Sequence, residues 1–206
     1  MNRAVVYQAA SIVLSYPDDD ILALREVVRR ALDESARGAS ASFAPLLEWW
    51  DASTPEAVQT SYVDTFDMSK RHALYLSYWT DGDTRRRGQV LADLKRRFRE
   101  QGLEISGTGE LPDHVPLVLE FAGSRPEAGA ALLQEYRASL ELIRLALAER
   151  ASPYAGVVAA VCATLPGRSP QDRQQAMAMA AQGPPTETVG LDAYDPRLLP
   201  MASGGR

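Results

Sequence analysis

Two histidines and one cysteine are the residues of this chain best suited to acid–base, nucleophilic or metal chemistry. His114 directly follows Asp113, and an aspartate that orients a histidine could make that histidine a general base. No nucleophile elbow accompanies the pair, and a polar pair at a helix start more often serves as a cap. We therefore interpret Asp113 as the cap of the helix that follows. A small hydrolase that uses Asp113 and His114 remains an alternative.

A metal site would have to be built from the same few side chains. Four-coordinate zinc would need His72, His114 and Cys162 together with a carboxylate, and their spacing matches neither CxxC nor HExxH. The sequence also contains no GxGxxG motif and no phosphate-binding loop. We expect no metal, no cofactor and no catalytic residue. Cys162 lies in the apolar run 157–163 and is interpreted as a small buried hydrophobic residue.

Aromatic and basic side chains are concentrated between residues 62 and 88, with the composition of a binding surface. Tyrosine combines an apolar ring with a polar hydroxyl, which favours interfaces where one end stays wet. A set of core aromatic residues beside a solvated basic face is the alternative interpretation. The candidate partner-binding residues are Tyr62, Phe66, Arg71, His72, Tyr75, Tyr78, Arg85 and Arg86.

One arginine of this region requires a partner of its own. Arg87 falls on the apolar stripe of a helix predicted from about residue 84 to 101, because successive helical residues turn by about 100°. A partly buried guanidinium needs a carboxylate or a carbonyl. The carboxylates considered as its partner are Glu120, Asp64 and Asp67. The candidate structural or hinge residues are Arg87, Asp113, His114 and Glu120.

The elements that would position these residues nearly all have the 3.6-residue period of an α-helix. Asp18 to Asp20 have the pattern of a cap for a second helix, whose inner stripe runs from Ile21 to Leu32. Thr54 followed by Pro55, and Ser69, also have the pattern of helix starts, and the helix after Ser69 would align Arg71 with Tyr75 and with Tyr78 or Trp79.

The segment 115–122 is apolar on nearly all sides and predicts a helix in the interior of the bundle. We expect loops at 35–42 and 103–111 and one long helix from 126 to 150. The sequence predicts an all-α, single-domain bundle of about nine helices at residues 1–183, followed by a flexible tail at 184–206.

Composition excludes several classes of protein. The net charge of −5 argues against a general nucleic-acid binder, which usually has a basic domain. A single cysteine cannot form an intrachain disulfide and fits a reducing compartment. No window approaches the ~20 apolar residues of a membrane span. We therefore expect a cytoplasmic protein without direct membrane insertion.

Two segments of the chain resemble a known family. They are residues 62–88 (YVDTFDMSKRHALYLSYWTDGDTRRRG) and residues 111–121 (LPDHVPLVLEF). Together, and in this order, they resemble the respiratory nitrate reductase assembly chaperones. These form the NarJ or delta-subunit family, within the wider TorD-like group of redox-enzyme maturation chaperones. In length and helix order the resemblance covers roughly residues 1–166.

The resemblance implies a non-catalytic, all-helical chaperone in the cytoplasm. Such a chaperone would bind the apo catalytic (alpha) subunit of nitrate reductase, notably its N-terminal segment, for molybdenum-cofactor insertion and complex assembly. The cofactor would belong to the client, and the chaperone would be a monomer or a weak dimer. A chaperone of another molybdoenzyme, and a structural subunit that stays in a membrane complex, remain alternatives.

Overall fold

The computed structural model describes residues 2–81, 85–105 and 109–182. In these ranges the chain forms twelve α-helices, one π-helical turn and one 3₁₀ turn, and its sole β-type pairing is a single bridge between Tyr75 and His114. The all-α prediction is confirmed. The helices outnumber the roughly nine expected, partly because two predicted helices are each broken once.

The N-terminal part of the bundle contains five helices. Their caps follow the sequence signals: an Asp18 carboxylate oxygen accepts from the Ile21 N–H at 2.9 Å, and the Thr54 hydroxyl oxygen accepts from the Ala57 N–H at 3.3 Å. The second predicted helix is interrupted at Leu24. The helices are α1 (Arg3–Leu14), α2 (Asp19–Ala23), α3 (Arg25–Ser35), α4 (Arg37–Ala52) and α5 (Pro55–Tyr62).

The loop predicted at 35–42 is wrong, because α4 already begins at Arg37. Ala36 and Ala39 are buried, and the Ser40 hydroxyl donates to the Asp33 carboxylate at 2.5 Å. The Ser, Ala and Gly residues of 35–42 resemble the composition of a loop, but alanine is also the best helix former. The burial of Ala36 and Ala39 in the bundle favours the helix.

The middle of the chain departs most from the prediction. Ser69 caps only a short 3₁₀ turn, and at Ala73 the chain leaves helical geometry (φ −54°, ψ 128°). The predicted helix after Ser69 is therefore wrong, and Arg71 and Tyr75 do not share a helix face. The elements here are η1 (Val63–Asp67, π-helical), η2 (Lys70–His72, 3₁₀), α6 (Leu76–Asp81) and α7 (Arg85–Glu100).

The C-terminal part contains five more helices. The single helix predicted from 126 to 150 is broken at Tyr136, whose φ of −95° and ψ of 18° leave the α-helical region. No proline or glycine marks this break, and the apolar stripe of the sequence continues through it. The sequence therefore contains no local signal for the break. The helices are α8 (Val115–Ser124), α9 (Pro126–Glu135), α10 (Arg137–Glu149), α11 (Ala155–Ala163) and α12 (Arg173–Gln182).

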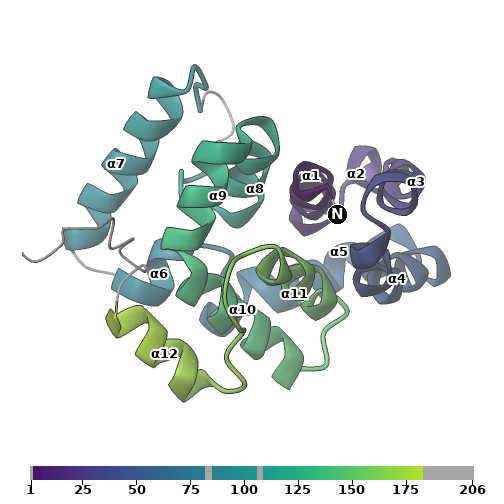
Figure 1. The fold of residues 1–206 in the computed structure, drawn as a ribbon. Helices are drawn as coiled ribbons and strands as arrows, with labels where there is room; N and C mark the ends of the chain where they lie inside the picture. Colours follow the sequence, from purple (N-terminus) through teal and green to yellow (C-terminus); the bar gives the residue numbers. More distant parts are fainter. Residues whose placement is uncertain (1, 82–84, 106–108, 183–206) are drawn as a thin grey trace, which may run out of the picture.

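Helices α1 and α8 pack together in the core, and Figure 1 shows α8 and α9 between α1 and α7. The Ser11 hydroxyl donates to the Pro116 carbonyl at 2.8 Å, a hydrogen bond that joins α1 to the first turn of α8. Val118 and Leu119 are fully buried, and each such side chain stabilises the fold by roughly 1.5–3 kcal/mol. The nearly all-apolar sequence of 115–122 therefore corresponds to an interior helix, as predicted.

Helix α7 lies at one edge of the bundle (Figure 1). Its apolar stripe is anchored by Leu94 and Phe98, both buried, and the Phe98 and Phe121 rings lie 4.5 Å apart between centroids. The basic side chains Lys95, Arg96 and Arg99 are exposed. The helix is thus held by one face only.

Two predicted features lie outside the described residues. They are the tail at 184–206 and most of the loop centre at 106–109, of which only Gly109 is described. The domain division at residue 183 consequently stays a prediction. Among the helices of the described ranges, none is long and apolar enough to cross a membrane.

The close approach of α8 and α9 gives a test of the packing. A Cβ on Gly129 would lie 2.2 Å from the Cα of Ala122, so we expect Gly129→Ala to destabilise the protein by about 1–3 kcal/mol. Gly88→Ala in α7 is the matched control, because nothing lies within 4 Å of its Cβ and alanine favours helices by up to about 1 kcal/mol. Urea unfolding measures both, and equal stability of the two variants would contradict this packing.

Candidate functional site

A buried carboxylate joins the two segments that the sequence singled out. The side chain of Asp113 is fully buried, and its Oδ2 accepts from the Ser77 hydroxyl at 2.6 Å and from the Ser77 N–H at 3.2 Å. The Leu76 N–H donates to the Asp113 carbonyl, and the Val115 N–H donates to the Leu74 carbonyl. Asp113 therefore does not cap α8 as predicted. It ties residues 74–77 to residues 111–115.

Arg87 completes this arrangement from α7. Its Nη2 lies 3.6 Å from the Asp113 Oδ2, and its Nε donates to the Ser77 hydroxyl oxygen at 3.2 Å. The side chain is 18% exposed, as its place on the apolar stripe predicted. The partner is Asp113 rather than Glu120, Asp64 or Asp67, all of which are exposed.

Tyr75 and His114 face each other across the bridge between the two segments. Their ring centroids lie 5.3 Å apart, and the Arg87 guanidinium lies 5.7 Å from the Tyr75 centroid. Glu110 approaches both rings: it accepts from the Tyr75 hydroxyl at 3.4 Å and lies 3.6 Å from His114 Nδ1. Burial raises the pKa of Tyr75, and the Glu110 carboxylate raises it further.

Tyr75, Glu110 and His114 line part of a small cavity of about 150 Å³, which we call the aromatic cavity. Two carboxylates, Asp67 and Glu110, lie among its aromatic residues, so its charge is negative. Tyr16 also borders a neighbouring depression of about 300 Å³, to which Glu56 and Asp64 contribute two more carboxylates. The aromatic cavity is lined by Tyr16, Tyr62, Phe66, Asp67, Leu74, Tyr75, Glu110 and His114.

The floor of the aromatic cavity belongs to the core. Tyr62 and Phe66 are only 5% and 6% exposed, and their rings lie 4.8 Å apart. The Tyr62 hydroxyl donates to the Leu14 carbonyl at 2.9 Å, and Phe66 packs edge-on against Tyr154 at 5.0 Å. These two candidates thus hold the cavity in place, and Tyr16 and Tyr75 are its more exposed aromatic residues.

A larger cavity of about 870 Å³ contains three other candidates, Arg71, His72 and Tyr78, and we call it the cationic cavity. It lies among η2, α6, α10 and α12, and its described lining includes four exposed cations and a single carboxylate, Glu149. None of the described residues lines both this cavity and the aromatic cavity. The cationic cavity is lined by Lys70, Arg71, His72, Tyr78, Trp79, Ala146, Glu149, Arg150 and Arg173.

The aromatic side of the cationic cavity is fixed by local contacts. The Trp79 indole N–H donates to the Ala73 carbonyl at 3.0 Å, and the Arg173 guanidinium lies 5.8 Å from the Trp79 ring centroid. His72 is buried and its Nδ1 lies 3.1 Å from the Ser69 hydroxyl. Burial lowers the pKa of His72, and the nearby Arg150 and Arg71 lower it further, so this imidazole is neutral at pH 7.

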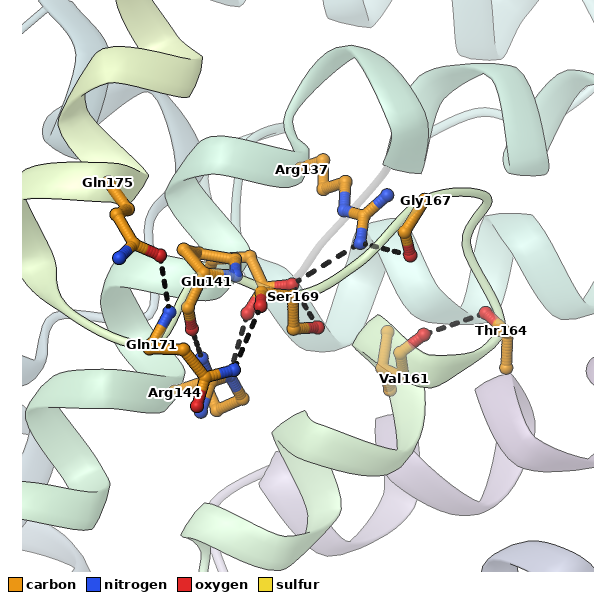
Figure 2. Close-up of polar contacts among 10 residues, drawn as sticks. Arg137, Glu141, Arg144, Val161, Thr164, Gly167, Ser169, Gln171 and Gln175 are labelled. Carbon is orange, nitrogen blue, oxygen red and sulfur yellow. Dashed lines mark hydrogen bonds and ion pairs between the residues drawn. The ribbon is translucent and has the colours of Figure 1, made fainter.

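A second buried carboxylate holds the wall that α12 contributes. Glu141 is fully buried and accepts from Arg144 Nε at 2.6 Å and from the Ser169 hydroxyl at 2.5 Å. Arg137 lies 3.6 Å from Glu141 and donates to the Gly167 carbonyl, as Figure 2 shows. This network fastens the segment 167–170, which leads into α12, onto α10.

Sequence reasoning missed the Glu141 network and six of the nine described residues that line the cationic cavity. Arg137, Glu141 and Arg144 recur at i, i+4 and i+7 on the buried face of α10, so charged residues at core spacing were an available signal. The pairing of Arg173 with Trp79 has no such signal. Nothing in the local sequence relates two residues so far apart.

The remaining candidates lie elsewhere. Glu120 is exposed and borders a pocket of about 220 Å³ between α7 and α8, away from Arg87. Arg86 is exposed on α7, and the side chain of Arg85 lies outside the described residues. The eight predicted partner-binding residues are therefore divided between two cavities and α7.

The geometry of Asp113 and His114 differs from that of the Asp–His dyad considered as an alternative. The Asp113 side chain turns to Ser77 and Arg87, whereas His114 Nδ1 faces Glu110. Cys162 is buried, and burial raises the pKa of its thiol. In the described ranges no group of three His, Cys, Asp or Glu side chains could hold a metal ion.

The Arg87–Asp113 pair leads to a prediction about stability. Arg87→Met keeps most of the side-chain volume but leaves the buried Asp113 without its cation, so we expect a loss of about 3 kcal/mol. Arg96→Met on the same helix removes an exposed pair with Asp93 and should cost less than about 1 kcal/mol. Chemical denaturation of both variants distinguishes them. An Arg87→Met variant as stable as Arg96→Met would refute the importance of the pair.

The two histidines predict a pH dependence. Burial lowers the pKa of both His72 and His114, although Glu110 and Asp113 partly oppose the shift at His114. The unfolded chain, with histidine pKa values of about 6.5, then binds more protons than the folded protein just below that pH. Their contribution to stability is present above about pH 6.5 and is lost as the pH falls toward the lowered pKa values.

Urea unfolding at about pH 7.5 and about pH 5.5 tests this expectation. The native chain should be less stable at the lower pH, and the double variant His72→Gln/His114→Gln should show a smaller difference. An unchanged difference in the double variant would mean that other groups cause the pH dependence.

Comparison with known proteins connects this geometry to a family. Residues 29–160 match the family model described as nitrate reductase delta subunit. The chain is 42% identical to the nitrate reductase-like protein NarX of Mycobacterium tuberculosis over 161 residues, 78% of this chain and 24% of NarX. It thus spans about a quarter of that relative's length.

Two further similarities cover most of the matched protein. The chain is 30% identical over 176 residues to the probable nitrate reductase molybdenum cofactor assembly chaperone NarJ of Bacillus subtilis, over 80% of this chain and 90% of that protein. A crystal structure described as a redox enzyme maturation protein of Archaeoglobus fulgidus superposes with a TM-score of 0.59 at 22% identity, over 78% and 92% of the two chains. That likeness concerns the fold alone. The family model and the sequence relatives agree: the chain belongs to the nitrate reductase delta-subunit family.

Proposed function

We propose that this chain is an assembly chaperone of a respiratory nitrate reductase and that it binds the N-terminal segment of the apo catalytic subunit. The observation that carries the proposal is the similarity to Bacillus subtilis NarJ over 90% of that protein's length. The chaperone would hold the catalytic subunit ready for molybdenum-cofactor insertion and complex assembly. It would act in the cytoplasm as a monomer or weak dimer, without catalysis of its own.

The aromatic cavity is the proposed site for the client's N-terminal segment. A helix that docks into a groove needs apolar anchors in the groove and polar groups at its rim that set the register. Tyr16 and Tyr75 supply rings, and Asp67 and Glu110 supply charge. With Glu56 and Asp64 in the adjoining depression, the site would favour a basic amphipathic segment.

The rival functions receive less support from the geometry. A hydrolase would need Asp113 to orient His114, and the Asp113 carboxylate instead binds Ser77 and Arg87. The NarX and NarJ proteins reported above are both named for nitrate reductase, which favours that enzyme over another molybdoenzyme as the client. A permanent subunit would co-purify with mature enzyme, whereas a chaperone binds the apo subunit.

Calorimetric titration with a peptide that copies the client's N-terminal segment tests the proposal. We expect micromolar binding with a negative heat-capacity change, because apolar surface enters the aromatic cavity. Asp67→Asn/Glu110→Gln should weaken binding roughly tenfold, since two rim carboxylates would be lost. Asp19→Asn/Glu127→Gln removes the same charge from exposed positions on α2 and α9 and is the control. Equal binding by both double variants would exclude the aromatic cavity, and no binding by the native chain would exclude the N-terminal segment.

A further inference from the structure

The cationic cavity has no role in the proposed recognition of a basic segment. Four exposed cations, Lys70, Arg71, Arg150 and Arg173, surround it, and among the lining residues that the structure describes Glu149 is the single carboxylate. The chain as a whole carries a net charge of −5, so this surface has the opposite sign to the average. A concentration of positive charge in a cavity attracts anionic groups.

The construction of the cavity favours a polypeptide over a small anion. The cations come from η2, the C-terminal end of α10, where Arg150 is the cap residue, and α12, and all four side chains are exposed and therefore hydrated. Sites for small molecules usually bury most of the ligand and place a few polar groups around it. A cavity of about 870 Å³ with cations spread around its edge instead suits a charged chain that lies across it.

Two aromatic residues give the same cavity an apolar side. Tyr78 and Trp79 are half-buried, and the Trp79 ring is fixed by its hydrogen bond to the Ala73 carbonyl. Arg173 lies over that ring, so a cation and an aromatic surface are presented together. A segment that alternates acidic with apolar side chains would satisfy both features.

We propose that the cationic cavity binds an acidic segment of the client protein, separate from the N-terminal segment held at the aromatic cavity. That the partner is the client rests on the proposed function; the acidic character of the segment rests on the cavity itself. The two sites are close together along the chain, because Phe66 and Asp67 line the aromatic cavity and residues 70–72 line the cationic cavity. Arg150 of the cationic cavity also donates to the carbonyl of Asp64, which lines the depression beside the aromatic cavity, at 3.4 Å. One client could thus occupy both at once, which raises its overall affinity without a tight contact at either site.

The test uses the full chain and a fluorescein-labelled peptide as the probe. In this peptide, single glutamates alternate with leucine-alanine pairs. We expect binding that weakens as salt is added, since the cations are exposed. Lys70→Gln/Arg71→Gln should reduce the affinity roughly tenfold, because both side chains lie at the cavity edge. Arg30→Gln/Arg37→Gln removes the same charge from exposed positions on α3 and α4 and should leave the affinity unchanged.

Three results would overturn the proposal. They are no binding of the acidic probe, an equal loss in the two double variants, and equal binding of a probe with glutamine in place of glutamate. Inorganic pyrophosphate provides a further arm. If pyrophosphate displaces the probe and binds more tightly than the probe does, the cavity is a site for small anions instead.

The same variants separate this inference from the proposed function. Lys70→Gln/Arg71→Gln should retain calorimetric binding of the client's N-terminal peptide but bind the apo catalytic subunit more weakly than the native chain does. Loss of the acidic probe with retention of the N-terminal peptide supports the cationic cavity as a second site. Unchanged affinity for the apo subunit would show that the client does not use it. Failure of the N-terminal peptide alone would count against the proposed function and leave the cationic cavity in place.

Discussion

The buried carboxylate of Asp113 is the constraint on which both cavities depend. A fully buried charge must be paired, because an unpaired one costs several kcal/mol, and here Ser77 and Arg87 supply the pairing. This requirement fixes residues 74–77 against residues 111–115. Tyr75 then lies beside His114 in the aromatic cavity, while Tyr78, at the start of the helix that follows, lines the cationic cavity. One pairing therefore determines where two aromatic residues, three positions apart, are presented.

Segregation of charge explains how an acidic chain can carry a strongly basic stretch. Arg87 is withdrawn into the Asp113 pair, and Arg97 binds Glu135 of α9. The cations of the cationic cavity are grouped apart from the carboxylates around the aromatic cavity. Net charge averages over these surfaces and conceals them. Two sites of opposite sign would suit the proposed client, because exposed charge pairs give a preferred orientation and moderate affinity.

Sequence patterns predicted the elements whose signals are local. The caps at Asp18 and Thr54 and the interior helix after His114 were confirmed, because a cap or an apolar run of one helix depends on neighbouring residues. The break at Tyr136 and the extended segment after Ala73 were missed, since each is imposed by contacts with distant parts of the chain. Contacts with distant parts of the chain also limited what could be predicted about the site. Arg87 was assigned a buried partner on angular grounds, but the choice of Asp113 required the fold.

The Glu141 network shows how far such distant constraints reach. Arg137, Glu141 and Arg144 lie on the face of α10 that helical spacing assigns to the core (Figure 2). Both arginines form ion pairs with Glu141. The Ser169 hydroxyl and the Gly167 carbonyl bind to Glu141 and Arg137 of this network. They therefore hold the segment before α12 against α10. Gly167 has a φ of 94° and would bring a Cβ within 2.9 Å of Arg137, so glycine is required at this position. The Arg173 wall of the cationic cavity is thus set by buried charges rather than by any local preference of α12.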